Sequence, residues 1–456
     1  MRCSRYIYYL SVWLFILPGK INAQEILQRY IDTGLENNLA LLRSYLDIEI
    51  AEKALEVSRA KFLPSVSLEA SYSRAGGGRV IEVPAGDLIN PVNEQINQLL
   101  GETRLPVDIP NRVEEFLPDN FHNTGLRIIQ PVINTDVYYN FRAEKMKISI
   151  QQAKMDIWKN QLIKEIKVSY YRYLKLLEQR KIFMENRKLL NETLEFHKKL
   201  VIHGKATKNL IFDSRSQLAE NNSRLAEIDS DIKRSRNYFN YILNRDMSSK
   251  ILKDSLASIA IINPGELTFQ KKAQEERSEI KQLKVGLELK ELELDHSKAF
   301  WVPKLDLVGT AGFQGYGYTF NQHQDFWFLQ IGMSWNIFSG GGHKAKVEQA
   351  QLEKSGLLNE LEELRNKISL EVADARNELQ EALESLHYSK TEVENAWLNY
   401  EIVNKQYRQG MILPLELKDA QALYIKALLK EVISEYTVRI RQAEFEAAAG
   451  LNIENI

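Results

Sequence analysis

The chain has little of several features that define common protein classes. Its 456 residues include one cysteine, Cys3, and 11 prolines. A lone cysteine excludes an intramolecular disulfide framework and a multi-cysteine metal site. The formal net charge of -1 leaves no basic excess for a nucleic-acid partner. Beyond the N-terminus, no apolar run approaches the roughly 20 residues that a membrane-spanning helix needs.

The first residues have the pattern of an export signal. Arg2 and Arg5 precede an apolar run from Tyr6 to Leu17, and residues 21–23 offer a cleavage site. We therefore predict a signal peptide over residues 1–23, which would remove the only cysteine and place the protein in a bacterial envelope. The alternative is an N-terminal anchor helix, but the run is shorter than a bilayer span.

Long stretches rich in Glu, Lys, Leu, Ala and Gln are abundant, and this bias is typical of long helices or coiled coils. Residues 343–407 contain no proline and place apolar side chains at steps of four and three. This seam consists of Leu357, Leu361, Leu364, Ile368, Val372, Ala375, Leu379, Ala382 and Leu386. The spacing predicts a helix of about 95 Å with a coiled-coil face, and residues 139–201 are its counterpart. Such lengths require a bundle, a coiled coil or a tube.

The two halves of the chain repeat each other at a fixed spacing. Gly204 and Gly410 lie 206 residues apart, as do Asp213 and Asp419. Both halves have the order helix, proline, strand-loop-strand, long helix, glycine turn, helix, with each glycine ending a long helix. We therefore divide the chain into a first repeat at 24–262 and a second at 263–456.

Between each proline and the long helix, the apolar period changes to two. Apolar residues alternate with polar ones over 65–73, 305–313 and 327–335, whereas 123–132 alternates poorly. The strands are either membrane strands or a small soluble layer packed on the helices. Four strands cannot close a membrane barrel, because the smallest use eight, so membrane strands would have to be shared between protomers. Residues 74–122 predict an extended loop with a short helix near 88–100.

Few residues have a type and spacing typical of a catalytic, metal or ion-binding site. The seven histidines are scattered without metal-ligand spacing, and we predict no metal site, no catalytic residues and no cofactor. Glu416 and Asp419 lie three residues apart on one helix face just after Gly410. They could form a ring of carboxylates in an oligomer, which would favour cations. They could equally cap the start of a helix, where acidic residues are favoured by the dipole.

Taken together, the chain resembles the TolC family of outer-membrane factors. The resemblance rests on the duplicated plan, on Gln130-Pro131-Val132-Ile133 and Asn336-Ile337-Phe338-Ser339-Gly340-Gly341, and on Tyr407 to Gly410 with Glu416 to Ala420. It implies a mainly α protein with membrane β-strands. Each protomer would contribute four strands to a shared trimeric 12-stranded β-barrel and long helices to an α-helical coiled-coil barrel.

The same resemblance implies a function. The protein would be the passive exit duct of a tripartite efflux or type I secretion system, without enzymatic activity, in the bacterial outer membrane with a periplasmic helical tunnel. Its partners would be two further copies of itself, a periplasmic adaptor, an inner-membrane pump and outer-membrane lipid. The alternative is a soluble periplasmic coiled-coil scaffold or adaptor. The sequence does not identify the transported substrate.

The resemblance also implies roles for individual residues. It implies a pore constriction of Tyr407, Glu416 and Asp419. It also implies adaptor docking at the helical tips, for which we name Gly204, Ala206, Thr207, Gly410, Leu413 and Pro414. Two positions depart from the family pattern, because Ile412 stands in place of a gate arginine and Leu210 in place of its acidic partner. We therefore expect closure by apolar packing rather than by a charged latch.

Overall fold

The computed structural model describes residues 23–253 and 268–451. The predicted signal peptide lies outside the described residues, except for Ala23. The chain forms two compact units, which we call the helical unit and the sheet unit. The helical unit lies within residues 1–51, 146–288 and 354–456, and the sheet unit comprises residues 52–145 and 289–353. Each unit draws on both halves of the chain.

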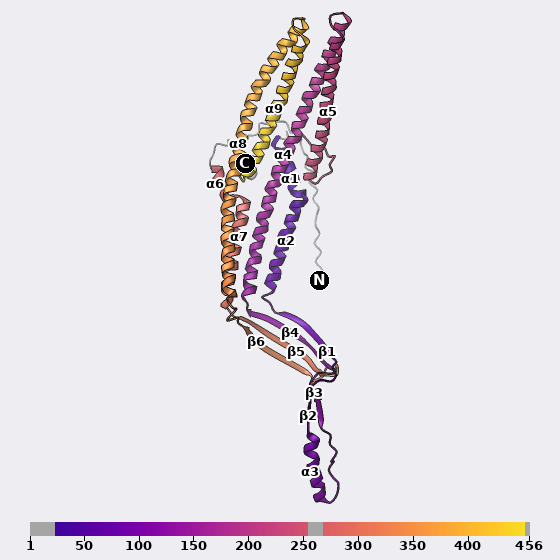
Figure 1. Ribbon diagram of the computed structural model, residues 1–456, viewed down its shortest axis with the longest axis vertical. Helices are drawn as coiled ribbons and strands as arrows, with labels where there is room; N and C mark the ends of the chain where they lie inside the picture. The colour runs from indigo at the N-terminus through magenta and orange to yellow at the C-terminus, as the bar shows by residue number, and fades with distance from the viewer. Residues whose placement is uncertain (1–22, 254–267, 452–456) are drawn as a thin grey trace, which may run out of the picture. The chain divides into compact units, whose positions relative to one another are not determined.

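Long helices make up the helical unit, as the seam predicted (Figure 1). The helices that contribute to it are α1 (Ala23–Asn37), α2 (Leu39–Ala60), α4 (Thr135–Ile202), α5 (Asn209–Ile242), α6 (Thr268–Glu276), α7 (Ser278–Lys298), α8 (Gly342–Arg408) and α9 (Pro414–Ala448). With 68 and 67 residues, α4 and α8 confirm the two predicted long helices and extend them by a few residues. No helix in the described part of the chain is long and apolar enough to cross a bilayer.

Two helical hairpins end in the same turn. Gly204 separates α4 from α5 and Gly410 separates α8 from α9, with φ angles of +69° and +75°. In each turn the N–H of the next residue donates to a carbonyl five residues back, that of Leu200 at 2.8 Å or Gln406 at 3.0 Å. This is the pattern of a glycine C-cap, which satisfies carbonyls that the helix end leaves free. The predicted turns are confirmed.

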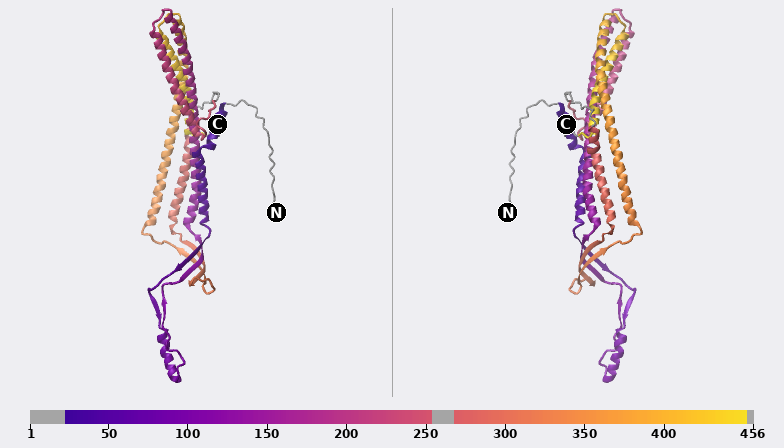
Figure 2. Two further views of the ribbon diagram at one scale, coloured as in Figure 1. Left: turned by 90° about the vertical axis from the view of Figure 1, so that its right-hand side faces the viewer. Right: turned by 90° about the vertical axis from the view of Figure 1, so that its left-hand side faces the viewer.

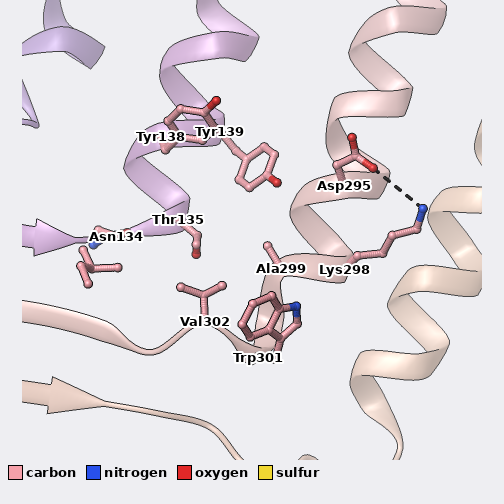
Figure 3. Close-up of a pocket in the computed structure, with 10 residues that line it drawn as sticks. Asn134, Thr135, Tyr138, Tyr139, Asp295, Lys298, Ala299, Trp301 and Val302 are labelled. Atoms are coloured by element: carbon pink, nitrogen blue, oxygen red, sulfur yellow. Dashed lines mark ion pairs between the residues drawn. The ribbon is translucent and has the colours of Figure 1, made fainter.

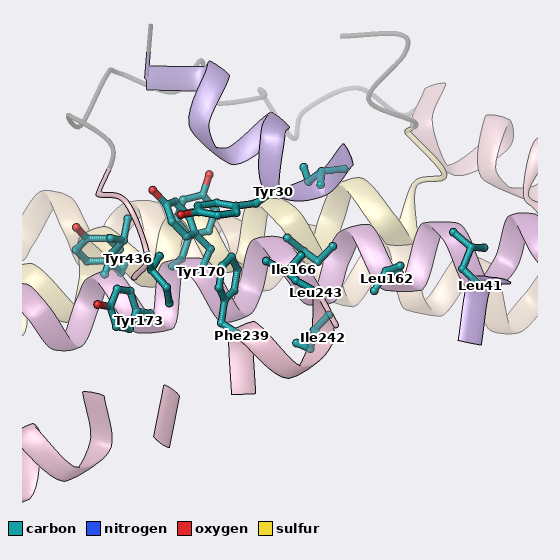
Figure 4. Packing of buried hydrophobic residues seen from close by; sticks show 14 residues of the cluster. Tyr30, Leu41, Leu162, Ile166, Tyr170, Tyr173, Phe239, Ile242, Leu243 and Tyr436 are labelled. Atoms are coloured by element: carbon teal, nitrogen blue, oxygen red, sulfur yellow. The ribbon is translucent and has the colours of Figure 1, made fainter. Parts of the chain in front are cut away.

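The core of the helical unit consists of two large apolar clusters. In the first, Tyr30 packs edge-on against Phe239 with ring centroids 5.0 Å apart, and Tyr170 lies beside both (Figure 4). The second contains the α8 seam, in which Ile368 and Leu379 are fully buried. Each such side chain contributes about 1.5–3 kcal/mol by leaving water. The coiled-coil face predicted for residues 343–407 is therefore the packed face of α8.

The sheet unit contains a four-stranded antiparallel sheet in the order β1-β4-β5-β6. Its strands are β1 (Ser65–Ser73), β4 (Phe121–Ile133), β5 (Lys304–Tyr316) and β6 (Asp325–Ser334), with the short helix η1 (Ala299–Trp301) before β5. All four predicted strands exist. The poorly alternating segment at 123–132 is a central strand, and its register shifts between Pro131 and Ile133.

The extended loop predicted over 74–122 is wrong where the segment forms two short strands. The segment forms a two-stranded ribbon of β2 (Val80–Val83) and β3 (Arg112–Glu115), which carries helix α3 (Ala85–Leu100). The short helix near 88–100 is confirmed and starts earlier than predicted. The prolines misled the prediction, because Pro84 precedes the helix, Pro91 is accommodated inside it, and others lie in the return segment. Figure 2 shows the ribbon and α3 from two sides.

Candidate functional site

One face of the sheet is apolar across all four strands. The register places residues of the same face in rows. One row is Leu68, Leu126, Ala311 and Trp327, and the next is Val66, Ile128, Gly309 and Leu329. These side chains are not covered, since Trp327 is 80% and Ile331 70% exposed. An apolar surface of this extent marks a site that contacts lipid or another protein.

The opposite face of the sheet is mostly polar, although Val308 and Phe328 also lie on it. Its central row is Ser67, Arg127, Thr310 and Phe328, and the next row contains Glu69. Arg127 Nη1 lies 3.5 Å from the Glu69 carboxylate. Among the described residues, β1 and β6 each pair with one neighbour only, so the sheet has two open edges. A sheet with one apolar face, one polar face and two unpaired edges is an incomplete structure.

A buried hydrogen-bond chain joins the two helical hairpins near their tips. The hydroxyl of Tyr407 on α8 lies 2.8 Å from Nε2 of His197 on α4, and Nδ1 of His197 lies 2.6 Å from Oγ of Ser214 on α5. The Ser214 hydroxyl donates to the carbonyl of Leu210 at 2.9 Å. Because that hydroxyl proton is used, Nδ1–H donates to Ser214, and in a neutral imidazole Nε2 then accepts from Tyr407. With a neutral imidazole, both ring nitrogens and both hydroxyl protons of these three residues have a partner.

Burial supports this protonation state. His197 is 4% exposed, and burial is the main cause that lowers its pKa, although the nearby Asp213 carboxylate acts in the opposite direction. Burial also raises the pKa of Tyr407. At neutral pH the imidazole is uncharged and the phenol is protonated, as the direction of the hydrogen bonds requires.

The predicted constriction residues fall into two groups. Tyr407 is buried with Tyr400 and Leu417, and Ile412 packs against this cluster. Glu416 and Asp419 are exposed on the same helix, α9, and do not belong to the buried cluster. The Glu416 carboxylate accepts the Leu413 N–H at 3.5 Å, which is a capping contact at the limit of a hydrogen bond.

An ion pair crosses between the hairpins at the same level. Nζ of Lys418 on α9 lies 3.0 Å from the carboxylate of Asp213 on α5. Asp213 is the repeat counterpart of Asp419, so the two halves use this position differently. Both partners are nearly half exposed, so the pair contributes about 0.2–1 kcal/mol.

The predicted tip residues surround the two glycine turns, which lie at the same end of the helical unit (Figure 1). Gly204, Thr207, Gly410, Leu413 and Pro414 are exposed, and Ala206 is partly buried. Two strongly exposed apolar residues beside them were missed, Ile202 at 79% and Met411 at 69%. Apolar side chains that no part of the described chain covers suit a protein partner.

The buried polar residues near the tips were also missed. Besides His197 and Ser214, a second network links the hairpins, in which Asn186 on α4 accepts from Gln421 on α9 at 2.9 Å and donates to Asn221 on α5 at 2.8 Å. The available signal was a set of polar residues on helices expected to pack together. Their partners lie on other helices, so spacing along one helix could not identify them.

The sheet unit contains a shallow hollow of about 470 Å³ beside the start of α4 (Figure 3). Tyr139, Trp301 and Val302 line it, and Asp295 and Lys298 form a 3.8 Å ion pair at its edge. Nearby, Asp136 accepts from His296 at 2.9 Å and from Lys304, and the Lys304 hydrogen bond is the main cause that lowers the pKa of Asp136. These contacts tie helix ends to a strand and provide no activated nucleophile.

Residues 270–451 match the protein family described as outer membrane efflux protein. The part of the chain that is similar to this efflux protein domain is less than half of its length. This domain covers most of the second repeat, including α8, α9 and the strands β5 and β6. No curated protein matches the chain by sequence. Among the described residues, no group of three or more His, Cys, Asp or Glu could hold a metal ion.

Solved structures extend the likeness beyond the efflux protein domain to nearly the whole chain. The outer membrane channel CmeC of Campylobacter jejuni has a TM-score of 0.75 at 14% identity, over 99% of this chain and 93% of that one. The outer membrane protein VceC of Vibrio cholerae has a TM-score of 0.74 at 14% identity, over 93% and 96%. The open MtrE outer membrane channel of Neisseria gonorrhoeae has 0.74 at 16%, over 98% of each chain. The chain therefore has the fold of these channels.

Proposed function

We propose that this protein is one protomer of a trimeric outer-membrane channel, in which three four-stranded sheets close one barrel of twelve strands. The observation that carries the proposal is the sheet with a continuous exposed apolar face and two open edges. Open edges are not stable in lipid, because unpaired N–H and C=O groups have no water to bond. Pairing β6 of one copy with β1 of the next satisfies both edges and turns the apolar faces toward lipid.

The structure argues against a soluble periplasmic scaffold or adaptor. If the strands formed a soluble layer packed on the helices, their apolar side chains would be covered. Instead Trp327, Ile331 and Leu68 are each at least 70% exposed. A protein that kept this face in water would tend to aggregate.

In this proposal the protein acts as a passive exit duct for efflux or secretion, with its helical hairpins in the periplasm. A periplasmic adaptor would dock at the tips, around Gly204, Ala206, Thr207, Gly410, Leu413 and Pro414, and an inner-membrane pump would supply the energy. The exposed apolar side chains of Ile202 and Met411 support such a docking surface. Tyr407, Glu416 and Asp419 would form the constriction at the entrance.

Purification from the outer membrane tests the proposal. We expect a trimer that resists dissociation in SDS, requires detergent for solubility and forms pores in a planar bilayer. A monomer that stays in solution without detergent, or a detergent-purified protein that forms no pores, would contradict the proposal.

The acidic ring has its own test. In a trimer, Glu416→Gln with Asp419→Asn removes six carboxylates from the entrance, so we expect weaker block of the pore by multivalent cations. Glu360→Gln with Glu363→Gln is the matched control, because these two exposed carboxylates also lie three residues apart, in α8 and far along the helix from the Gly410 turn. If the first pair changes the block no more than the control pair, Glu416 has a capping role and there is no acidic ring.

A further inference from the structure

The segment between β1 and β4 is folded with its polar side inward. We call β2, α3, the return segment 101–111 and β3 the arm. The amide of Asn90 donates to the Ile109 carbonyl and accepts the Ile109 N–H, both at 2.9 Å. Asn97 binds the Leu105 backbone in the same two-way manner, at 2.7 and 2.9 Å, and Asn93 donates to the Pro106 carbonyl at 2.7 Å.

The return segment lies so close to α3 that one position admits no side chain. A Cβ on Gly86 would lie 2.0 Å from the Ile109 carbonyl oxygen. With Asn90, Asn93 and Asn97, this glycine forms a single face, because the spacings of four, three and four residues follow the helix period. This asparagine face uses the polar side of α3 to hold the arm together.

The apolar side of α3 lies beside the asparagine face and is not used to hold the arm together. Its apolar stripe consists of Ala85, Ile89, Val92, Ile96 and Leu99, at steps of four, three, four and three. Leu99 is 87% and Val92 54% exposed. The spacing is that of a coiled-coil seam, with Ile89 and Ile96 at a positions and Ala85, Val92 and Leu99 at d positions.

The charges of α3 indicate what covers the stripe. The helix has no lysine or arginine, and its only charged residues, Asp87 and Glu94, lie on the side opposite the stripe. A helix that lies on an anionic membrane surface carries basic residues beside its apolar face. By contrast, identical helices can pack on this seam without repulsion, because both acids occupy the outermost f positions. The d positions hold Ala85, Val92 and Leu99, of which only Val92 is β-branched, so the number of helices in the bundle follows from the proposed trimer and not from the seam.

We infer that the apolar stripe of α3 packs against the same stripe of two other copies, so that three arms form a three-helix bundle. The inference rests on the proposed trimer. Three identical faces that meet in a threefold assembly must meet on its symmetry axis. That axis is also the axis of the pore. The bundle therefore stands across the exit path at the β1–β4 end of the barrel, and cargo must leave between the arms.

Disulfide crosslinking in the full-length protein tests this contact. Cys3→Ala removes the one natural cysteine, and Val92→Cys then places a thiol in the seam. Glu94→Cys is the matched control on the opposite side of the same helix. Under mild oxidation we expect covalent dimers within the trimer for Val92→Cys and none for Glu94→Cys. We also expect Val92→Cys pores to conduct less when oxidised and to recover when reduced.

Each other outcome overturns the bundle. A stable, conducting trimer without Val92→Cys crosslinks, or with equal crosslinking at both positions, would leave the proposed channel intact and contradict the seam. Val92→Trp provides a second test, since a residue inside the bundle is shielded from lipid. Quenching of its fluorescence by brominated lipids would assign the stripe to the membrane instead. If no trimer forms at all, the proposed function fails and the bundle fails with it.

Discussion

At the scale of single residues, the hydrogen-bond chain through His197 distinguishes this protein's tips. With a neutral imidazole, Tyr407 donates to His197, His197 to Ser214 and Ser214 to a backbone carbonyl. This series of hydrogen bonds crosses from one hairpin to the other, with Tyr407 on α8 and Ser214 on α5. If the hairpins separate at the channel entrance, this contact must break.

The hydrogen bonds of His197 predict that the contact between the two hairpins weakens as pH falls. Burial lowers the pKa of His197 in the closed tips, so as pH falls through the ordinary imidazole value of about 6.5, the separated form takes up a proton that the closed form does not. The closed contact is therefore at full strength above that value and weakens below it. Tyr407, Asp213 and Lys418 face the site, but histidine is the residue type among them that titrates between about pH 5 and 8.

We expect amide hydrogen exchange at the tips of α4 and α8 to accelerate between about pH 7.5 and pH 5, once the intrinsic pH effect is subtracted. His197→Gln should abolish this extra acceleration. His203→Gln should retain it, because His203 lies exposed in the glycine turn outside the network. A pH response that survives His197→Gln would assign the effect to other groups.

At the scale of elements, the same glycine turn occurs twice because each long helix must reverse within a few residues. A residue in the left-handed conformation ends such a helix and lets its last carbonyl groups be hydrogen-bonded. Glycine adopts this conformation without a Cβ clash. The ends of α5 and α9 repeat the pattern with Asn244 and Gly450, at φ angles of +50° and +68°. The sequence pattern predicted the turns at Gly204 and Gly410 because their conformation depends on local residues.

Gly410→Ala should destabilise the tip by about 1 kcal/mol, since alanine is strained at a positive φ. Gly356→Ala is the matched control inside α8, where an added Cβ meets nothing within 4 Å. That change should instead stabilise the helix by about 0.5–1 kcal/mol. Local amide exchange and denaturant midpoints measure both effects. Equal effects of the two substitutions would contradict the left-handed cap.

At the scale of the whole molecule, the proposed channel depends on the sheet. Its rows of paired residues separate an apolar face from a polar face across strands that come from both halves of the chain. In a single copy, the two edge strands each lack a second neighbour and the apolar face is uncovered, among the residues that the structure describes. In the proposed channel, assembly with two further copies completes the sheet, because open edges are not stable in lipid.

Ile331 and Gln330 are adjacent residues of β6 that point to opposite faces of the sheet. Ile331→Arg should cost about 2–4 kcal/mol in each protomer if its face contacts the middle of the bilayer. Gln330→Arg, on the polar face, should leave the trimer intact. The measurement is the yield of SDS-resistant trimer in outer-membrane fractions. Equal yields for the two variants would contradict the assignment of the lipid face.

The sequence by itself determined the long helices, the glycine turns, the places of the strands and the duplicated order of elements. These features follow from local periodicity and backbone preference, which act between residues close in the chain. Only the tertiary structure decided the partners of His197, the register of β4 and the inward polar face of α3. In each case the deciding contact comes from a distant segment, so no pattern within one helix or strand could specify it.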